Sequence, residues 1–369
     1  MSEKMSEVYE AYDMEVINSG RGRGFTLLRT DKGTRRLCPC NIGEARLARE
    51  REFKDNLYDA GFTRIDRCVA DRDGELITCD RYGNPYILME YFEGRECNPN
   101  HIEELEAAAK NLAEFHKAGR LLWEKETEGS GRTFDGEPGG LSRKVKELKR
   151  VRQFISGRKV KNDFELMYIK HFNYYFEQAL DASHMMQEAW EHEANVESLV
   201  YNPYEQEKIF ETETGEDRIK EQSGTGNEKN NGIGYCHGSY SYHNVIITED
   251  GIATVNFDSF HVGFQLVDLY QFTRKVIEKT GYRLETARRI IEAYGQAQPL
   301  TAKDHEYIYI LLKFPEKFWK VSNHYINSRK SWISPVNIEK IRKIIEHEQE
   351  KQKFLNDFSC YFGVHKITK

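Results

Sequence analysis

The spacing of apolar residues changes once along the chain, and this change constrains the fold more than any other feature. Residues 14–98 contain short alternating apolar runs typical of strands, interrupted by one helical stretch at 44–60. After Gly94 the apolar residues recur every three to four positions, which is typical of helices. A small strand-rich part followed by a larger helical part predicts an α+β protein.

Turn residues mark the ends of these elements. Asp31-Lys32-Gly33 separates strands expected at 25–30 and 34–37, and Gly61 ends the helix at 44–60 as a C-cap. Beyond Gly94 we expect helices over 101–118, 141–198 and 267–358, with a short β unit at 235–260. The stretch 203–232 is polar and rich in Glu, Gly and Asn, and we predict that it is a mobile surface insertion.

Composition narrows the class of partner. The 369-residue chain carries a net charge of -6, which argues against nucleic acid as its main ligand. No window has the length and apolarity of a membrane span, and the first residues lack the apolar core of a signal peptide, so we expect synthesis in the cytoplasm. The seven cysteines are scattered, which fits a reducing compartment better than a disulfide framework.

Three alternate glycines, Gly20, Gly22 and Gly24, come directly before the first strong strand. Glycines at this spacing let backbone N–H groups approach a phosphate closely, as the glycine-rich loop of kinases does. The alternative is a flexible hairpin turn that binds no ligand.

The next strand ends at Cys38, where a kinase places the lysine that holds the nucleotide phosphates. A thiol cannot replace an ammonium group in that contact. Glu50, on the following helix, is the expected partner of that lysine, and Glu90 to Phe92 would form the hinge that meets an adenine. The nucleotide-binding candidates are therefore Gly20, Gly22, Gly24, Cys38, Glu50, Glu90 and Phe92.

The segment YCHGSYSYHNVIITEDGIATVNFDSF, residues 235–260, has the spacing of a phosphotransferase catalytic loop followed by a metal-binding turn. Ser239 stands where the catalytic acid is expected, and Asn256 stands where a metal-binding acid is expected. Asn244, five residues after Ser239, keeps the expected metal-binding amide. Asn244, Asn256 and Asp258 are the metal-ligand candidates, although Mg²⁺ prefers carboxylates.

Asp268 follows this segment at the start of a helix. It is a candidate for the buried acid that braces the catalytic loop in kinase-like folds, and a plain helix N-cap is the alternative. Together these motifs predict a bilobal protein-kinase-like fold of the α+β class. We expect a small β-rich N-lobe at 1–97 and a larger helical C-lobe at 98–369.

Six segments carry a resemblance to a known family. The chain resembles the CotS family of bacterial spore-coat proteins, within the aminoglycoside/choline-kinase-like phosphotransferases. The resemblance rests on RGRGF (21–25), YILMEYFEGREC (86–97), NLAEFHKAG (111–119), LKRVRQFI (148–155), CHGSYSYHNV (236–245) and FPEKFWKVSNHYINSRKSW (314–332). The last of these is the most specific to the spore-coat branch. Its aromatic residues interleave with lysines and arginines, so it forms either a core helix or a docking groove.

The resemblance implies a protein made in the mother-cell cytoplasm, assembled on the spore coat during sporulation, and in contact with other coat proteins. Because Cys38, Ser239 and Asn256 depart from the family pattern, we expect a pseudokinase with a structural or interaction role and no required cofactor. One alternative is an active small-molecule phosphotransferase that uses ATP and Mg²⁺ at a displaced metal site. Another is a binding module that holds a small-molecule ligand in the interlobe cleft.

Overall fold

The computed structural model shows how these elements are arranged. It describes residues 5–22, 24–130, 134, 136–200, 232–327 and 335–364, with backbone only for 191–200, 335 and 336. The predicted insertion at 203–232 lies outside the described residues except for Gly232.

The chain forms two compact units, each made from separate stretches of sequence. Unit 1 contains residues 1–133 and 234–300, and unit 2 contains residues 134–233 and 301–369. Unit 1 therefore combines the strand-rich part with the helices and loops that carry the predicted catalytic segment. The lobe boundary predicted after residue 97 stays a prediction.

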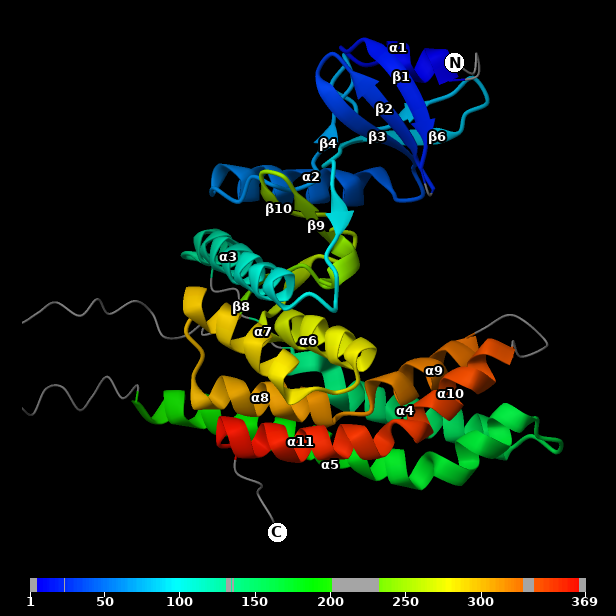
Figure 1. Cartoon of the computed structure of the whole chain (residues 1–369), viewed down its shortest axis with the longest axis vertical. Helices are drawn as coiled ribbons and strands as arrows, with labels where there is room; N and C mark the ends of the chain where they lie inside the picture. The colour runs from blue at the N-terminus through cyan, green and yellow to red at the C-terminus, as the bar shows by residue number, and fades with distance from the viewer. Residues whose placement is uncertain are drawn as a thin grey trace, which may run out of the picture. The chain divides into compact units, whose positions relative to one another are not determined.

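The helices and strands follow one another along the chain as Figure 1 shows. In unit 1 they are α1 (Ser6–Glu10), β1 (Val16–Arg21), β2 (Thr26–Thr30), β3 (Gly33–Pro39), α2 (Glu44–Asp59), β4 (Cys68–Val69), β5 (Thr78–Cys79), β6 (Pro85–Glu90), β7 (Arg95–Glu96), α3 (Ile102–Thr127), β8 (Ile233–Cys236, whose first residue belongs to unit 2), β9 (Val245–Thr248), β10 (Gly251–Thr254), β11 (His261–Phe264), α6 (Leu266–Thr280) and α7 (Leu284–Ala297). In unit 2 they are α4 (Leu141–Ser156), α5 (Asp163–Val200), α8 (Ala302–Lys313), α9 (Glu316–Asn327), α10 (Pro335–Glu346) and α11 (Glu348–Phe362).

The strands of the N-terminal part form one antiparallel sheet. Its order is β1-β2-β3-β6-β4, with β5 also paired to β6. The predicted turn at 31–33 joins β2 to β3, and their register pairs Thr30 with Gly33. The catalytic segment forms a second, smaller sheet in the order β10-β9-β7, so a strand from the end of the N-terminal part pairs with strands some 150 residues later in the chain.

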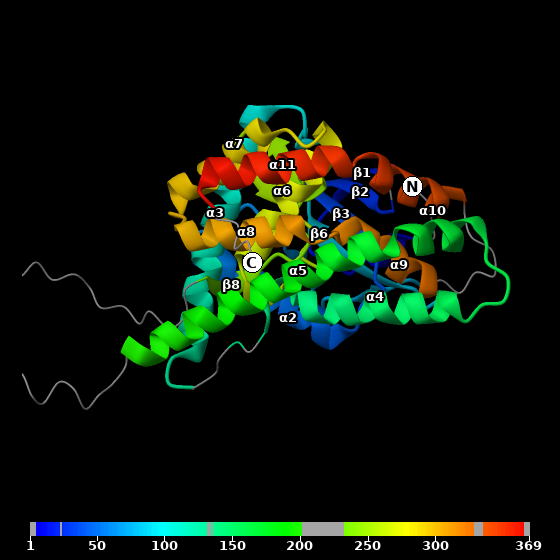
Figure 2. The same ribbon diagram turned by 90° about the horizontal axis from the view of Figure 1, so that it is seen from below.

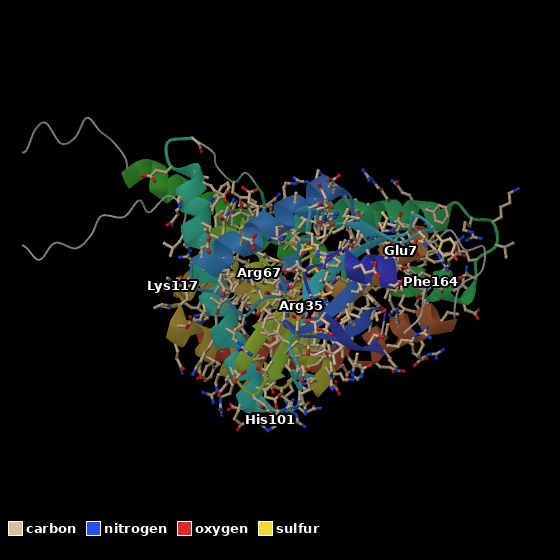
Figure 3. All side chains as sticks on the ribbon, turned by 90° about the horizontal axis from the view of Figure 1, so that it is seen from above. Glu7, Arg35, Arg67, His101, Lys117 and Phe164 are labelled. Atoms are coloured by element: carbon tan, nitrogen blue, oxygen red, sulfur yellow. The ribbon has the colours of Figure 1, made fainter. Side chains whose placement is uncertain are left out.

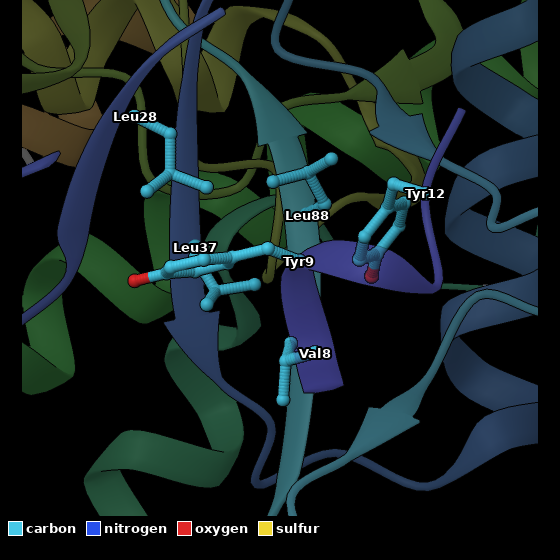
Figure 4. Packing of buried hydrophobic residues seen from close by; sticks show 6 residues of the cluster. All are labelled: Val8, Tyr9, Tyr12, Leu28, Leu37 and Leu88. Carbon is cyan, nitrogen blue, oxygen red and sulfur yellow. The ribbon is translucent and has the colours of Figure 1, made fainter. Parts of the chain in front are cut away.

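One face of the N-terminal sheet is covered by α1, which the sequence pattern did not reveal. Val8, Tyr9 and Tyr12 of this short segment pack against Leu28, Leu37 and Leu88 of β2, β3 and β6 (Figure 4). The Tyr12 hydroxyl lies 2.6 Å from Thr78 Oγ1, and burial raises the pKa of Tyr12 to about 12. The apolar side of the sheet is thus closed by residues that precede its first strand.

The helix predictions hold, with differences in where the helices end and in how the longer stretches divide; the stretch 267–358, for example, is divided among α6 to α11. The helix expected at 44–60 is α2, and Gly61 follows it with a left-handed φ of +94°. The helix expected to end at 118 continues to Thr127, and Gly119 and Trp123 in this extension are buried. The long helical stretch at 141–198 is two helices, α4 and α5, with Gly157 as the C-cap of α4.

Unit 2 has an aromatic core. Phe318 of α9 stacks on Tyr168 and Tyr175 of α5, with ring centroids 5.1 and 4.4 Å apart. Phe318 and Tyr325 of α9 are buried, as is Phe314 just before it, whereas Trp319 is partly exposed and donates to Glu147, so the inner face of this helix belongs to the core. Within the described ranges, no helix combines the length and apolarity that a membrane crossing requires.

Candidate active site

The glycine-rich turn lies between β1 and β2. Gly20 is within β1 and pairs with Leu27, whereas Gly22 begins the turn and donates its N–H to the Phe25 carbonyl at 2.9 Å. The Phe25 ring folds back over Gly22, where a Cβ atom would lie 2.4 Å from it. The centre of the Phe25 ring also lies 6.0 Å from that of Tyr91, within the predicted hinge. A side chain of this chain therefore packs against the turn that we predicted to cover phosphates.

Cys38 does not face an open phosphate site. It packs with Leu47, Cys68 and Met89 between β3 and α2. Burial raises the pKa of the Cys38 thiol, so the thiolate is disfavoured. Cys38 is thus part of an apolar cluster in this structure.

Strand β3 brings a cation to this site two residues before Cys38, which the alignment with a kinase motif did not predict. Arg36, two residues before Cys38, hydrogen bonds to the Asp66 carboxylate. Both of its terminal nitrogens also lie 3.3 Å from Asn256 Oδ1. Strand alternation explains the outcome, because residues two apart on a strand point to the same face.

Glu50 also differs from its expected role. Its carboxylate accepts a hydrogen bond from Lys54, one turn later on α2, at 2.6 Å. Lys54 Nζ lies 3.0 Å from Asp66 Oδ1, and it also donates to the Asp66 carbonyl at 2.8 Å. Burial lowers the pKa of Lys54, but the charges of Asp66 and Glu50 outweigh it and hold this pKa above its ordinary value. The glutamate that would serve a strand lysine in a kinase therefore serves a lysine of its own helix.

We call these four residues, Arg36, Glu50, Lys54 and Asp66, the ionic cluster. Lys54 and Asp66 are each 1% exposed and Glu50 is 7% exposed. Two cations face two acids, and charges this deeply buried are stable only when paired in this way.

Ser239, Asn244 and Asn256 are brought together by the structure, and we call them the neutral cluster. Asn256 Nδ2 donates to Asn244 Oδ1 at 2.9 Å, and Asn244 Nδ2 donates to the Ser239 carbonyl at 3.1 Å. The Ser239 hydroxyl lies 3.4 Å from the Asn256 carbonyl oxygen and closes the loop. A working phosphotransferase would carry acids at the positions of Ser239 and Asn256, and here these residues and Asn244 bind one another without any charge.

Asn256 joins the two clusters. Its backbone N–H donates to Asp66 Oδ2 at 3.0 Å, while its side chain belongs to the neutral cluster. Its φ of +66° is left-handed, a conformation that Asn adopts more readily than most residues. Asn256 therefore keeps the shape of the turn without the charge of an aspartate.

Asp258 does not join either cluster. It is exposed, and Arg46 of α2 hydrogen bonds to its backbone carbonyl. Among the described residues, no group of three or more His, Cys, Asp and Glu side chains is arranged to hold a metal ion.

Mg²⁺ therefore does not fit the residues that the motif offers. The side-chain oxygen of Asn244 accepts from Asn256, and that of Asn256 faces the Arg36 guanidinium. Mg²⁺ prefers carboxylate ligands, which these two amides do not provide, and it would have to displace the Arg36 guanidinium to reach Asn256.

Asp268 lies beneath the segment that carries Ser239. Its carboxylate accepts the backbone N–H groups of His237 and Gly238 at 2.6 and 2.9 Å. Burial raises the pKa of Asp268, but the contacts with His116 and His237 outweigh it and leave this pKa below its ordinary value. The acid thus holds the loop in shape from a fully buried position.

The predicted hinge residues are engaged with arginines. Glu90 binds Arg67 at 3.2 Å, and the Arg64 guanidinium lies 5.6 Å from the centre of the Phe92 ring. Figure 3 labels Arg67 among the described side chains. No predicted site residue lines the pocket of about 580 Å³ beside α2, which is lined by Arg46, Arg49, Glu52, Phe53, Asn56, Glu126, Tyr235, Phe260 and His261.

Comparison with known proteins supplies the fold class. No family model and no curated protein matches the sequence. Among solved structures, an aminoglycoside phosphotransferase from Alicyclobacillus acidocaldarius matches with a TM-score of 0.71 at 14% identity, over 96% of this chain and 95% of that one. Spectinomycin phosphotransferase, in a complex with ADP and spectinomycin, matches with a TM-score of 0.51 at 11% identity, over 92% of each chain.

An ethanolamine kinase from Plasmodium vivax gives a TM-score of 0.51 at 11% identity, over 95% of this chain and 84% of that one. At such identities the likeness concerns the fold alone. The predicted α+β, protein-kinase-like fold is confirmed, and it is the fold of aminoglycoside phosphotransferases and choline-kinase-like proteins.

Three residues of the ionic cluster, Arg36, Lys54 and Asp66, were not predicted from the sequence. Arg36 could have been found from strand alternation, since it shares a face with Cys38. Lys54 could have been found as the (i, i+4) partner of Glu50 on α2. Asp66 had no such signal, because it lies in a loop and its burial depends on the fold of the whole unit.

Proposed function

We propose that this protein is a pseudokinase, a kinase-like fold that has lost phosphoryl transfer and acts through binding. The observation that carries the proposal is the closed neutral cluster of Ser239, Asn244 and Asn256. Phosphoryl transfer depends on metal ions held by carboxylates and on an acid that orients the attacking hydroxyl. The neutral cluster supplies neither of these groups.

The ionic cluster supports the same proposal. Arg36 supplies the positive charge that Cys38 lacks, but this charge is directed at Asp66 and Asn256. Asp66 is in turn bound by Arg36, Lys54 and the Asn256 N–H. Each of these charges already has a protein partner, so binding a Mg-nucleotide would require breaking this network.

Calorimetric titration and turnover assays test this proposal. We expect the purified chain to bind ATP weakly if at all, to show no dependence on Mg²⁺, and to give no turnover with aminoglycosides or choline-like alcohols. Because Arg36 already provides a cation, the double variant Ser239→Asp/Asn256→Asp supplies only the two missing carboxylates. It tests whether they restore Mg²⁺-dependent nucleotide binding. Mg²⁺-dependent nucleotide binding that appears in this variant alone supports the proposal.

One result would favour the alternative, an active phosphotransferase with a displaced metal site. That result is Mg²⁺-dependent turnover by the unmodified chain that is lost in both Asn244→Ala and Asp258→Ala. Asp258 is exposed and its side chain is outside both clusters, so its involvement would require a rearranged turn.

The biological setting of the proposal is the spore coat, and it rests on the resemblance of six sequence segments to the CotS family. A fluorescent fusion, expressed from its own promoter in the sporulating source organism, tests it. A ring of fluorescence around the developing spore supports a coat role with other coat proteins as partners. Fluorescence that stays spread through the mother-cell cytoplasm contradicts it.

A further inference from the structure

The helix α4 and the turn after it carry a concentration of positive charge. Residues 141–161 contain nine Lys or Arg residues and a single acid, Glu147, in a chain whose net charge is -6. None of these residues takes part in the ionic or neutral cluster, so the proposed function leaves this charge unexplained.

The charge is arranged on one face of the helix. Leu141, Val145, Leu148, Val151 and Ile155 are buried and form the inner face of α4. Arg143, Lys146, Arg150 and Phe154 are exposed and follow one another at spacings of three and four residues. This spacing places them along one outer stripe of the helix.

Much of this positive charge has no acidic partner. Lys144 points inward and binds Glu316 at 2.8 Å, and Arg143 binds Glu147 at 2.5 Å. Lys146, Arg150 and Lys159, by contrast, make no ion pair with any residue that the structure describes. Like charges this close together repel one another, so an anionic partner would relieve the repulsion.

Exposed apolar side chains gather at the end of the stripe. Phe154 is 48% exposed, Val160 in the following turn is 83% exposed, and Leu166 at the start of α5 is 56% exposed. Figure 2 shows α4 and α5 as neighbouring antiparallel helices joined at one end by this turn. The basic stripe thus leads to an apolar tip on the same helical hairpin.

We propose that this hairpin docks on an anionic lipid bilayer. Cations on the outer stripe of α4 would lie against acidic headgroups, and Phe154, Val160 and Leu166 would enter the boundary of the acyl chains. An acidic protein or a nucleic acid would satisfy the cations, but neither accounts for a valine that is mostly exposed at the tip. The proposal is independent of whether the chain transfers phosphate.

Vesicle co-sedimentation of the full chain tests the proposal. We expect binding to phosphatidylcholine vesicles that contain about one third phosphatidylserine, and none to phosphatidylcholine alone. The variant Lys146→Glu/Arg150→Glu/Lys159→Glu should bind about 100-fold more weakly, because three cations at the surface become anions. The variant Phe154→Ser/Val160→Ser should lose roughly tenfold.

A matched control makes the same change in net charge at other positions on the surface. Lys125, Lys340 and Lys353 are exposed, and their simultaneous replacement by Glu should leave vesicle binding within about threefold. Circular dichroism should give the same helical content and melting temperature for all variants. The proposal is overturned if anionic vesicles do not retain the unmodified chain, or if the control loses as much binding as the variant Lys146→Glu/Arg150→Glu/Lys159→Glu. It is also overturned if polyglutamate binds both the unmodified chain and the tip variant as tightly as vesicles do, since the surface then recognises a soluble polyanion.

Discussion

Two polar clusters meet at Asn256, and they differ in charge and in depth. The ionic cluster consists of two cations and two acids that are almost fully buried, apart from the partly exposed Arg36. The neutral cluster consists of a serine and two asparagines that are partly exposed and carry no charge. The ionic cluster is held by contacts between charged side chains, whereas the neutral cluster also uses the backbone carbonyls of Ser239 and Asn256.

The comparison of the two clusters shows where this chain has charged side chains and where it has neutral ones. Charged side chains lie where they connect α2 and β3 to the loop before β4 and to the turn at Asn256. Charge is absent at the positions that would meet phosphate, metal and the attacking hydroxyl. The ionic cluster therefore contributes to the fold, whereas under the proposed function the neutral cluster keeps the shape of a kinase catalytic loop without its electrostatics.

The largest effect should come from removing the acid at the centre of the ionic cluster. Asp66→Ala leaves Arg36 and Lys54 without their shared partner, and an uncompensated buried charge costs about 3–5 kcal/mol. Urea unfolding followed by circular dichroism measures this loss as a fall in the free energy of unfolding.

Two variants sharpen this result. Asp55 forms a half-exposed ion pair with Arg51, so Asp55→Ala should cost less than about 1 kcal/mol. Asn244→Ala, in the neutral cluster, should cost about 1 kcal/mol, the usual net value of a hydrogen bond. If Asn244→Ala cost as much as Asp66→Ala, the distinction between a stabilising and a vestigial cluster would fail.

The next effect concerns the brace beneath the neutral cluster. Asp268→Asn should lower the free energy of unfolding by about 2 kcal/mol, because an amide NH₂ group would then face a backbone N–H that now has an acceptor. Ser239→Ala serves as its comparison, and it should cost only about 0.5 kcal/mol, since the hydroxyl contacts are 3.3 to 3.4 Å long. A larger loss from Ser239→Ala would mean that the serine, and not the buried acid, holds the loop.

A smaller effect should appear as a dependence of stability on pH. Burial lowers the pKa of His237 below its ordinary value of 6.5, which the nearby Asp268 opposes only in part. Protonation therefore favours the unfolded chain, so this contribution is complete above about pH 6.5 and is lost as the pH falls through the folded-state pKa. Thermal melts between neutral and mildly acidic pH measure the slope.

His237→Gln should flatten that slope, whereas the exposed His184→Gln should leave it unchanged. His116 is also buried with a lowered pKa, so part of the slope should remain in the His237 variant. A slope that is identical in the unmodified chain and in His237→Gln would show that this histidine does not contribute to the pH dependence.

Much of this fold was predictable from the sequence because local signals agree with it. Asp31-Lys32-Gly33 sets the turn between β2 and β3, and Gly61 ends α2 within a residue of the expected position. The spacing from Ser239 to Asn244 and Asn256 was enough to predict that these three residues meet. Such signals depend on backbone geometry over a few residues, which the sequence encodes directly.

The parts that could not be predicted depend on contacts between distant residues. Asp66 is one acid among 60 Asp and Glu residues, and only the folded unit shows that it is buried between Arg36 and Lys54. The covering of the sheet by Val8, Tyr9 and Tyr12 likewise depends on where a short segment docks. The kinase motif, aligned position by position, predicted that the strand lysine is replaced by Cys38. The structure places the cation of Arg36, two residues earlier on β3, at this site.

The smallest effect concerns the glycine-rich turn, which lies outside both clusters. Gly22→Ala should cost about 1 kcal/mol, because its Cβ would meet the Phe25 ring and push it from its place beside Tyr91. Gly20→Ala is the matched control, since a Cβ there meets no atom within 4 Å and the residue lies in strand β1. Thermal melts of both variants measure the difference, and equal melting temperatures would show that the Phe25 ring moves away without cost. That result would also mean that the turn is free to open, as a nucleotide-binding loop must, and it would weaken the contrast between this site and a working phosphotransferase.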